Sequence, residues 1–512
     1  MMLSDVVTVS NRLGSTGSRR TKIDLLATLL RELGAAEIAP VVAWLSGRPR
    51  QGRTGIGWRS LSAARGQPAD HPTLSVTEVD TRLSELAACS GAGSTTRRRE
   101  LLTELFGAAT AVEEDFLVRL LTGDLRQGAL EGIMTEAIAK ASGVPLDLVR
   151  RAFMLSGRLP ETAALALRDG ADGLAGVRLE VGRPIRPMLA SPAESLAAAL
   201  DDLGTEVSVE YKFDGARVQV HRNGDAVRVF TRTLREITGS VPEIVETVRG
   251  MPCTAVVLDG ETLAVDDSGR PRPFQQTMSR FGSEGLAPGS SGAELRSLLL
   301  QPYFFDCLHV DGEDLLDQPL AVRLDALDRV ARGHRIPAVL RPDPDAAAAE
   351  FDAALAAGHE GVMVKSLDAP YAAGRRGRSW QKVKPEHTLD LVVLGAEWGY
   401  GRRTGYLSNL HLGARDPDGG EPVMVGKTFK GLTDKLLEWQ TAEFPRYARD
   451  RDAQTVYLRP ELVVEIELDG VQVSTRYPGG VALRFARVLR YRPDKTAAEA
   501  DTIDAVRALL PK

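Results

Sequence analysis

Residues 210–217 read Glu-Tyr-Lys-Phe-Asp-Gly-Ala-Arg, and the rest of the chain is organised around them. The run before them, residues 205–209, and the run after them, residues 218–221, favour β-strands. Asp214-Gly215 supplies turn chemistry between these strands. Lys212 is therefore predicted at a strand end beside a tight turn, where a lysine can be desolvated and aimed. A lysine before a turn is ordinarily only a solvated charge, so this prediction depends on the motifs farther along the chain.

Length and composition describe a soluble protein with several cores. A chain of 512 residues predicts roughly two to four domains. Hydrophobic residues make up 43% of the chain and charged residues 26%, which is ordinary for globular domains. The formal net charge is −5, from 64 Lys and Arg against 69 Asp and Glu, so a nucleic-acid partner would have to be bound by local basic patches.

The three cysteines, Cys89, Cys253 and Cys307, are far apart in the sequence. This spacing provides neither the paired cysteines of a zinc site nor a disulfide framework, and it is typical of reduced thiols in a cytosolic protein. No stretch approaches the length of a membrane span. We therefore expect a cytoplasmic protein that makes no membrane contact.

The first third of the chain has helical periodicity. Apolar residues recur at helical spacing from residue 22 to about residue 167, which predicts an all-helical domain over residues 1–175. Arginines at residues 97–99 and 150–151 are ordinarily solvated, but as a set they could also contact a phosphate backbone. The Gly- and Ala-rich residues 169–182 lack clear periodicity and are predicted to form the linker.

The remainder divides into a mixed α/β domain over residues 184–390 and a strand-rich domain over residues 391–512. In the α/β domain the predicted strands cover residues 207–212, 217–222, 226–231, 254–264, 302–310 and 361–365, and the predicted helices cover residues 242–248 and 321–331. In the last domain, five or so short strands and one amphipathic helix fit a small β-barrel of the OB type. The predicted fold class is therefore multidomain: an all-α domain, an α+β domain and a C-terminal barrel.

A series of short motifs lies C-terminal to Lys212. In order, they are Thr231-Arg232, Leu258-Asp259-Gly260-Glu261, Phe304-Phe305-Asp306, Glu360-Gly361-Val362-Met363-Val364-Lys365, Trp380-Gln381-Lys382-Val383-Lys384, and the segment from Arg484 through Arg490 to Asp494-Lys495. Together with residues 210–217, this ordered set resembles the covalent nucleotidyltransferases, and the ATP-dependent DNA ligases in particular. The resemblance covers residues 184–495 and extends more loosely into the helical domain, for example at residues 121–128. Each motif alone is weak, but the complete set in order is specific.

The resemblance implies that Lys212 attacks the α-phosphate of ATP and releases pyrophosphate. AMP then passes to a 5′-phosphate on DNA, and a 3′-hydroxyl displaces it. Lysine is nucleophilic only when neutral, and its ordinary pKa is about 10.4. Burial, nearby cations such as Arg217, Arg232 and Lys382, and a bound metal would lower the pKa of Lys212. The implied cofactors are ATP and Mg²⁺.

Two carboxylates are candidate metal ligands. Glu261 comes after a strand-like run and an Asp-Gly pair, and Glu360 precedes the strand predicted at residues 361–365. Carboxylates at strand edges facing one pocket suit Mg²⁺, which keeps most of its waters, although either one alone is ordinarily a surface residue. The resemblance also places Glu261 on the ribose and Glu210 among the residues that bind the nucleotide.

Phe304 and Phe305 must point to opposite sides of their predicted strand. The resemblance assigns Phe305 to stacking on adenine, worth roughly 1–3 kcal/mol, and Phe304 then belongs to the core; a register error of one residue would exchange them. Lys382 and Lys384 alternate on one strand face. The resemblance places Arg376 and Lys382 on the nucleotide phosphates, with Lys384 in the same motif, although a basic surface patch is an equal alternative.

The last basic cluster contains Arg484, Arg487 and Lys495. The resemblance places these residues on the barrel, which would swing over the pocket so that they orient the pyrophosphate leaving group. Asp390 lies where the hinge of this movement is expected. The barrel would then swing away and admit DNA.

Related activities fit less well. NAD-dependent ligases carry a four-cysteine zinc site, capping enzymes that use GTP do not usually bring such a helical domain, and RNA ligases are typically shorter. A non-catalytic DNA-binding scaffold built on an inactive ligase is the alternative from another class. Against it, the motif residues are all present: Lys212, Glu261, Glu360, Lys382 and Lys384.

The leading hypothesis is an ATP-dependent DNA ligase that seals nicks in duplex DNA during replication, repair or recombination. It would act as a monomer in the cytoplasm, associated with the nucleoid when bound to DNA, and the sequence identifies no protein partner. The helical domain would grip the duplex, mainly through phosphate contacts. A chain beginning at Val181 would then still adenylate Lys212 but would bind nicks weakly.

Overall fold

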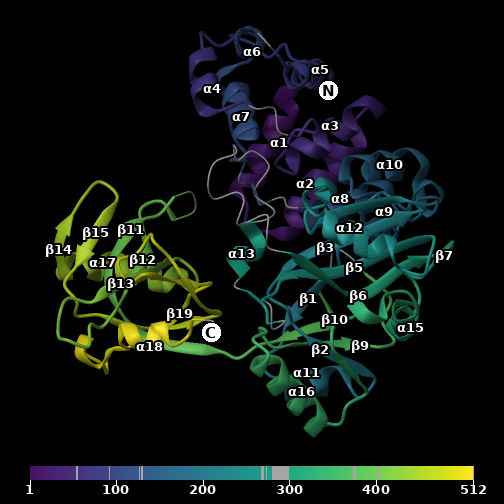
Figure 1. Ribbon diagram of the computed structural model, residues 1–512. Helices are drawn as coiled ribbons and strands as arrows, with labels where there is room; N and C mark the ends of the chain where they lie inside the picture. Colours follow the sequence, from purple (N-terminus) through teal and green to yellow (C-terminus); the bar gives the residue numbers. More distant parts are fainter. Residues whose placement is uncertain are drawn as a thin grey trace.

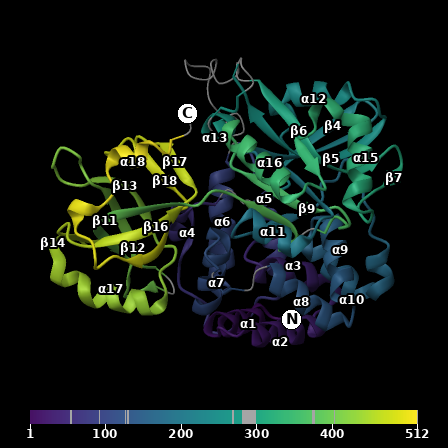
Figure 2. The ribbon, with the colours of Figure 1, turned by 90° about the horizontal axis from the view of Figure 1, so that it is seen from below.

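The structure is a computed structural model that describes residues 1–52, 56–91, 93–125, 127–128, 131–266, 270–272, 274–279, 299–372, 376–400 and 403–510. It has a helical part coloured purple to blue, a central part in teal and green, and a strand-rich part in light green and yellow (Figure 1). Seen from below, the strand-rich part lies to one side of the other two (Figure 2). Within the described ranges, no helix combines the length and the apolar character needed to span a membrane.

Helices alone form the described N-terminal part. They are α1 (Leu3–Ser15), α2 (Arg19–Glu32), α3 (Ala35–Leu45), α4 (Trp58–Ala64), α5 (Val76–Ala88), α6 (Ser94–Gly107), α7 (Ala111–Thr122), α8 (Glu131–Ser142), α9 (Leu146–Ser156) and α10 (Leu159–Ala175). Ser75 and Thr110 cap α5 and α7, and each cap is reciprocated by a glutamate three residues later. The apolar faces meet in one core that includes Trp44, Phe106 and Phe116.

Helices extend on both sides of residues 22–167, where helical periodicity was found, and they stay within the predicted domain of residues 1–175. Helix α1 precedes residue 22, and its apolar residues Leu3, Val6 and Leu13 are buried in the core. Helix α10 continues to Ala175, with a break at Gly170, where φ is 62°. Residues 169–175 are therefore helical, and the linker prediction was wrong for them. A stretch rich in Gly and Ala shows no clear hydrophobic periodicity, but it can still form a helix when that helix buries an apolar residue such as Leu174.

The central part contains two five-stranded sheets. One has the order β1-β10-β9-β2-β8 and the other β4-β3-β5-β6-β7. The first consists of β1 (Leu189–Pro192), β2 (Val207–Tyr211), β8 (Ala338–Leu340), β9 (Val362–Ser366) and β10 (Arg376–Val383). The second consists of β3 (Ala216–Asn223), β4 (Ala226–Thr231), β5 (Ala255–Ala264), β6 (Leu300–Val310) and β7 (Glu313–Asp314). Each strand predicted in this domain is present with its ends shifted by two residues at most.

Helices cover the outer faces of both sheets. Helices α11 (Leu196–Leu203) and α16 (Pro344–Ala356) lie on the first sheet, and α12 (Pro242–Arg249) and α15 (Leu320–Ala331) lie on the second, with the short α13 (Phe274–Ser279) beside β5 (Figure 1). Besides the apolar clusters beneath these helices, the two sheets share a further core, which contains Phe213, Phe305 and Trp380. Met154 and Leu155 of α9 belong to this same core, so the helical part is packed into the centre of the molecule.

The C-terminal part is rich in strands, as predicted. It contains β11 (His387–Trp398), β12 (Leu407–Ala414), β13 (Val423–Thr428), β14 (Ala448–Arg451), β15 (Thr455–Leu458), β16 (Val463–Leu468), β17 (Gly470–Val473), β18 (Val481–Arg484) and β19 (Arg487–Tyr491), with helices α17 (Asp434–Tyr447) and α18 (Ile503–Arg507). Strand β11 pairs with β12, β15 and β16, and the sheet packs around one large apolar core, with a second small cluster at Val392, Val463 and Ala500. We refer to this part as the barrel.

The predicted boundary between residues 390 and 391 falls inside β11. Pairing of β11 with β16 already begins at His387, opposite Leu468. The barrel therefore starts at His387, and the predicted boundary was four residues too late. Strand β10 ends at Val383, so Lys384, Pro385 and Glu386 alone connect it to the barrel.

Candidate active site

A cavity of about 650 Å³ opens between the two central sheets. Its volume suits a nucleotide-sized ligand. Seven of the residues predicted from the sequence line it: Glu210, Lys212, Arg217, Arg232, Glu261, Phe305 and Lys382. These residues come from strands or strand ends that are far apart in the sequence, and sheet pairing brings them together.

Lys212 lies directly after β2, and both its backbone and its side chain are bonded to the Glu360–Gly361 segment. The Lys212 amide donates to the Gly361 carbonyl (2.8 Å), and the Glu360 amide donates to the Lys212 carbonyl (3.0 Å). The Lys212 Nζ also forms an ion pair with the Glu360 carboxylate. Gly361 has a φ of 137°, and a Cβ there would lie 2.3 Å from the Val383 carbonyl oxygen. Only glycine therefore allows this close approach of backbone segments.

Positive charge is concentrated beside Lys212. Besides Lys212, the Glu360 carboxylate has Lys384 at 3.8 Å and Arg484 at 3.7 Å. Burial, followed by the repulsion of Lys384 and Lys212, lowers the pKa of Lys382. Several cations therefore lie near Lys212, some on the cavity wall and some around Glu360, which suits a ligand with several negative charges, such as a triphosphate.

Arg217 on β3 is held by a buried network. Its guanidinium donates to both oxygens of Asp259 (3.0 and 2.7 Å) and to the Met188 carbonyl (2.7 Å). The Tyr371 hydroxyl donates to the same carboxylate (2.6 Å). Arg217 is therefore a fixed part of the cavity wall, with its guanidinium 5.3 Å from the centre of the Phe305 ring. The sequence analysis selected neither Asp259 nor Tyr371, although Asp259 lies in a quoted motif.

The two phenylalanines of β6 face as the strand register predicted. Phe305 lines the cavity and is 8% exposed, whereas Phe304 is fully buried in the core beneath α12 and α15. Strand alternation explains the difference. An aromatic face is thus available to a base inside the cavity.

Glu210 and Lys365 form an ion pair between β2 and β9 at the cavity wall. Both side chains are almost completely buried. The Lys365 Nζ lies 4.2 Å from the ring centres of both Phe305 and Trp380. Lys365 lies in one of the motifs but was not among the predicted site residues, and a lysine inside a strand is ordinarily exposed.

The two candidate metal ligands differ. Glu261 lines the cavity, and burial raises its pKa to about 7 against the opposing effect of Arg217 and Lys212. No hydrogen bond to its carboxylate occurs among the described residues, so it could accept a cation. Glu360 is instead engaged by Lys212, Lys384 and Arg484, and in this arrangement it is not free to bind a metal. The described part of the chain has no cluster of three or more His, Cys, Asp or Glu side chains placed around a metal position.

The last basic cluster is divided between two places. Arg484 of β18 binds Asp214 (2.6 Å), two residues from Lys212. Lys384 binds Asp469 of the barrel (2.6 Å), which adds a second contact nearby. Arg484 therefore connects the barrel to the motif that contains Lys212.

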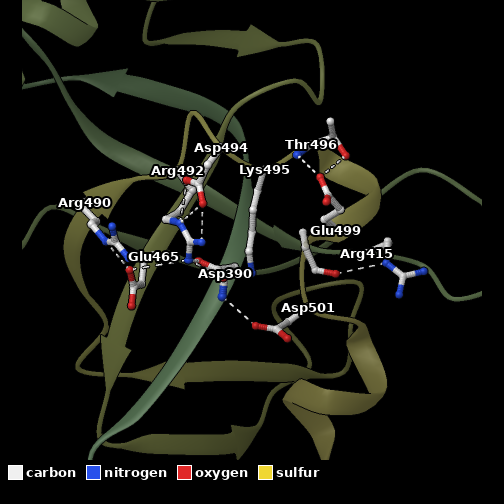
Figure 3. Close-up of polar contacts among 11 residues, drawn as sticks. Asp390, Arg415, Glu465, Arg490, Arg492, Asp494, Lys495, Thr496, Glu499 and Asp501 are labelled. Atoms are coloured by element: carbon white, nitrogen blue, oxygen red, sulfur yellow. Dashed lines mark hydrogen bonds and ion pairs between the residues drawn. The ribbon is translucent and has the colours of Figure 1, made fainter.

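Lys495 lies at another place, beside Asp390 on β11, the first strand of the barrel. It binds Asp390 (2.6 Å), which also receives Arg492 (3.0 Å), and Figure 3 shows Asp390 between these two side chains. Arg487 is exposed at the first residue of β19. In this arrangement only Arg484 lies beside the motif of Lys212, and the ion pair to Asp390 holds Lys495 on the barrel. That Arg484, Arg487 and Lys495 orient the pyrophosphate once the barrel swings over the pocket stays a prediction. The side chain of Arg376, at the start of β10, lies outside the described residues.

Comparison with known proteins agrees with this arrangement. The family described as "ATP dependent DNA ligase domain" matches residues 187–384, "DNA ligase N terminus" matches residues 58–139, and "ATP dependent DNA ligase C terminal region" matches residues 403–495. Relatives named "Probable DNA ligase" include one from Rhodococcus jostii, 71% identical, and one from Nocardia farcinica, 66% identical, each aligned over 100% of both chains. The solved structure "Pmar-Lig_PreS3" shares the fold, with a TM-score of 0.60 and 18% identity over 95% of this chain and 99% of that one. This chain therefore belongs to the family of ATP-dependent DNA ligases.

Proposed function

We propose that this protein seals nicks in duplex DNA through an AMP group carried on Lys212. The observation that supports this best is the position of Lys212, which lines the cavity while its backbone is hydrogen-bonded to the segment that carries Glu360. In the first step the Lys212 Nζ forms a bond to the α-phosphorus of ATP, and the bond to pyrophosphate breaks. The AMP is then transferred to the 5′-phosphate of the nick, and the 3′-hydroxyl displaces it to form the phosphodiester.

The cavity offers each part of ATP a partner. Phe305 would stack on the base, Glu210 would bind the base edge, and Glu261 would bind the ribose. Arg232, Lys382 and Lys384 would bind phosphates, because they supply positive charge at or beside the cavity. The resemblance to the family adds Arg376 to this set. Mg²⁺ fits best at Glu261, where it would neutralise phosphate charge.

Before ATP binds, the Glu360 carboxylate holds the Lys212 ammonium group. Lys212 can attack only after it loses a proton, and Glu360 is the carboxylate bonded to that group. Arg484 and Lys384 lie beside the same carboxylate and compete with Lys212 for it. We infer that Glu360 positions Lys212 for attack.

The DNA substrate would be gripped by the helical part. Its surface exposes arginines such as Arg97, Arg119 and Arg158, although each of these three is paired with a neighbouring carboxylate. We propose that it acts as a monomer. We place the protein in the cytoplasm, bound to the nucleoid when it is on DNA, in replication, repair or recombination.

The test is to incubate the purified protein with Mg²⁺ and ATP labelled at the α-phosphate, and to map the labelled peptide. The label is expected on Lys212. Lys212→Ala should take up no label and should still seal a nick that already carries AMP. Lys140→Ala removes a half-exposed lysine of the helical part and should label normally, which controls for the loss of a positive charge. Label on any other lysine would refute the assignment.

A further inference from the structure

The carboxylate of Glu210 lies in an unusual environment for an acid. It lines the cavity, yet it is only 3% exposed. Burial raises the pKa of Glu210, and the charge of Lys365 opposes this shift. Lys365 is also the only side chain that contacts this carboxylate among the described hydrogen bonds and ion pairs. A carboxylate has about four acceptor positions, so Glu210 retains capacity for a ligand.

Lys365 is held in place by its surroundings. It is 1% exposed, and its Nζ lies between the rings of Phe305 and Trp380, at 4.2 Å from each ring centre. These rings favour the charged ammonium form. Burying a charge without a partner is costly, and Glu210 supplies that partner.

These contacts place the Glu210 carboxylate next to the ring on which a base would stack. One ammonium group touches both the carboxylate and the face of Phe305. A purine stacked on Phe305 would therefore present its edge to Glu210. Adenine carries an exocyclic amine there, which is a hydrogen-bond donor, and an ionised carboxylate is an acceptor only.

We propose that Lys365 is a positioning residue for base recognition: it keeps Glu210 ionised and oriented, so that Glu210 accepts a hydrogen bond from the exocyclic amine of ATP. This inference rests on the proposed function. In this proposal Lys365 acts through Glu210 and forms no bond of its own to the base or to the reacting atoms. Its effect should therefore appear as selectivity between nucleotides, and not only as rate.

The experiment compares ATP with purine riboside triphosphate, which lacks only the exocyclic amine. Single-turnover transfer of the labelled nucleotide to Lys212 is measured for both, and the ratio of their rate constants at subsaturating concentration gives the preference. We expect the wild type to prefer ATP by about a hundredfold or more, because a buried acceptor is left unpaired with the analogue. Lys365→Met should reduce this preference about tenfold, because the acceptor becomes neutral and its hydrogen bond weaker.

A matched control removes another buried ion pair of the same domain. Arg323 on α15 is fully buried and binds Asp306, the residue after Phe305, but it does not line the cavity. Arg323→Met should destabilise the protein to a similar extent and leave the nucleotide preference unchanged. An unchanged preference in Lys365→Met, with both nucleotides slowed equally, would overturn the proposal.

Glu210→Gln provides a second measurement if Lys365→Met folds poorly. It keeps the size of the side chain and replaces the charged acceptor with a neutral one, so it should also reduce the preference about tenfold. In that background, Lys365→Met should change the preference no further, because Lys365 acts through Glu210. A further loss would overturn the proposal. Failure of the wild type to label Lys212 with ATP would instead refute the proposed function.

Discussion

The central domain holds its two neighbours by different kinds of contact. The helical part is joined mainly through apolar packing, since Met154 and Leu155 of α9 share a core with Phe213 and Phe305. Two ion pairs, Arg151 with Asp317 and Arg186 with Glu131, add to this packing. The barrel is joined through ion pairs, Arg484 with Asp214 and Lys384 with Asp469. Among the described residues, each apolar cluster of the barrel stays within the barrel.

This difference indicates which neighbour can move. Apolar side chains in a shared core cannot separate without exposing that core to water. Ion pairs at a half-exposed interface can be exchanged for pairs with phosphate groups at little net cost. We therefore expect the helical part to stay fixed on the central domain, and the barrel to be able to leave it when a charged ligand arrives.

The largest effect should come from removing the apolar contact. A chain beginning at Val181 lacks α9, so the core around Phe305 and Trp380 would be open to solvent. We expect near-complete loss of Lys212 labelling and of cooperative unfolding in this fragment. This replaces the prediction from sequence that the same truncation would leave adenylation intact.

A chain beginning at residue 143 is the matched control, because it keeps α9 and α10. It should label Lys212 far better than the shorter fragment while binding nicks weakly. If the fragment beginning at Val181 labels as fast as the full chain, the apolar contact is not needed for the active site.

The next effect concerns the ionic contact. Arg484→Ala removes the link to Asp214 and one of the cations beside Glu360. We expect roughly a 10²–10³-fold loss in the rate of Lys212 adenylation, the usual cost of removing one group that stabilises developing charge. Sealing of a nick that already carries AMP should fall far less, because no pyrophosphate leaves in that step.

Single-turnover rates on ATP and on the pre-adenylated nick make this comparison. Arg490→Ala is the control, since Arg490 is an exposed barrel arginine that binds Glu465 within the barrel (Figure 3). It should change neither rate by more than a few-fold. Equal losses in both assays for Arg484→Ala would mean that this contact holds the barrel in place and has no specific part in the ATP step.

The smallest effect should come from a charged contact inside the barrel. Glu397 on β11 accepts hydrogen bonds from Asn409 (2.6 Å) and His411 (3.1 Å) and pairs with Lys427. Burial raises the pKa of Glu397, but these partners outweigh it and hold the pKa at about 2. Because this is below the value of about 4.3 in an unfolded chain, the stabilisation is present at neutral pH and is lost as the pH falls towards about 2.

Glu397→Gln should therefore lower the free energy of unfolding by about 1–3 kcal/mol at neutral pH, and the difference from the wild type should vanish in acid. Denaturant unfolding at several pH values measures this. Glu421→Gln removes an exposed pair with Arg449 and should cost about 0.5 kcal/mol or less. A difference that persists in acid would show that packing, and not charge, accounts for the loss.

The sequence located the strands well, because they depend on local patterns, and the ordered motifs of the family located the cavity residues. The resemblance assigned Phe305 to the nucleotide, alternation then placed Phe304 in the core, and the strand-turn-strand pattern placed Lys212 at a strand end. Contacts between distant side chains could not be predicted in this way. No local pattern shows that Asp390 binds Lys495, that Asp259 anchors Arg217, or that Glu210 pairs with a buried lysine.

The backbone hydrogen bonds between Lys212 and the Glu360–Gly361 segment have a consequence for changes in chain length. Lys212 and Glu360 are 148 positions apart in the sequence, yet their spacing is set locally where β2 and β9 pair. Extra residues in surface turns between them, such as the turn at Gly224 that joins β3 to β4, would not shift one residue relative to the other. A tag or reporter inserted there should leave the reactive lysine and its carboxylate in register.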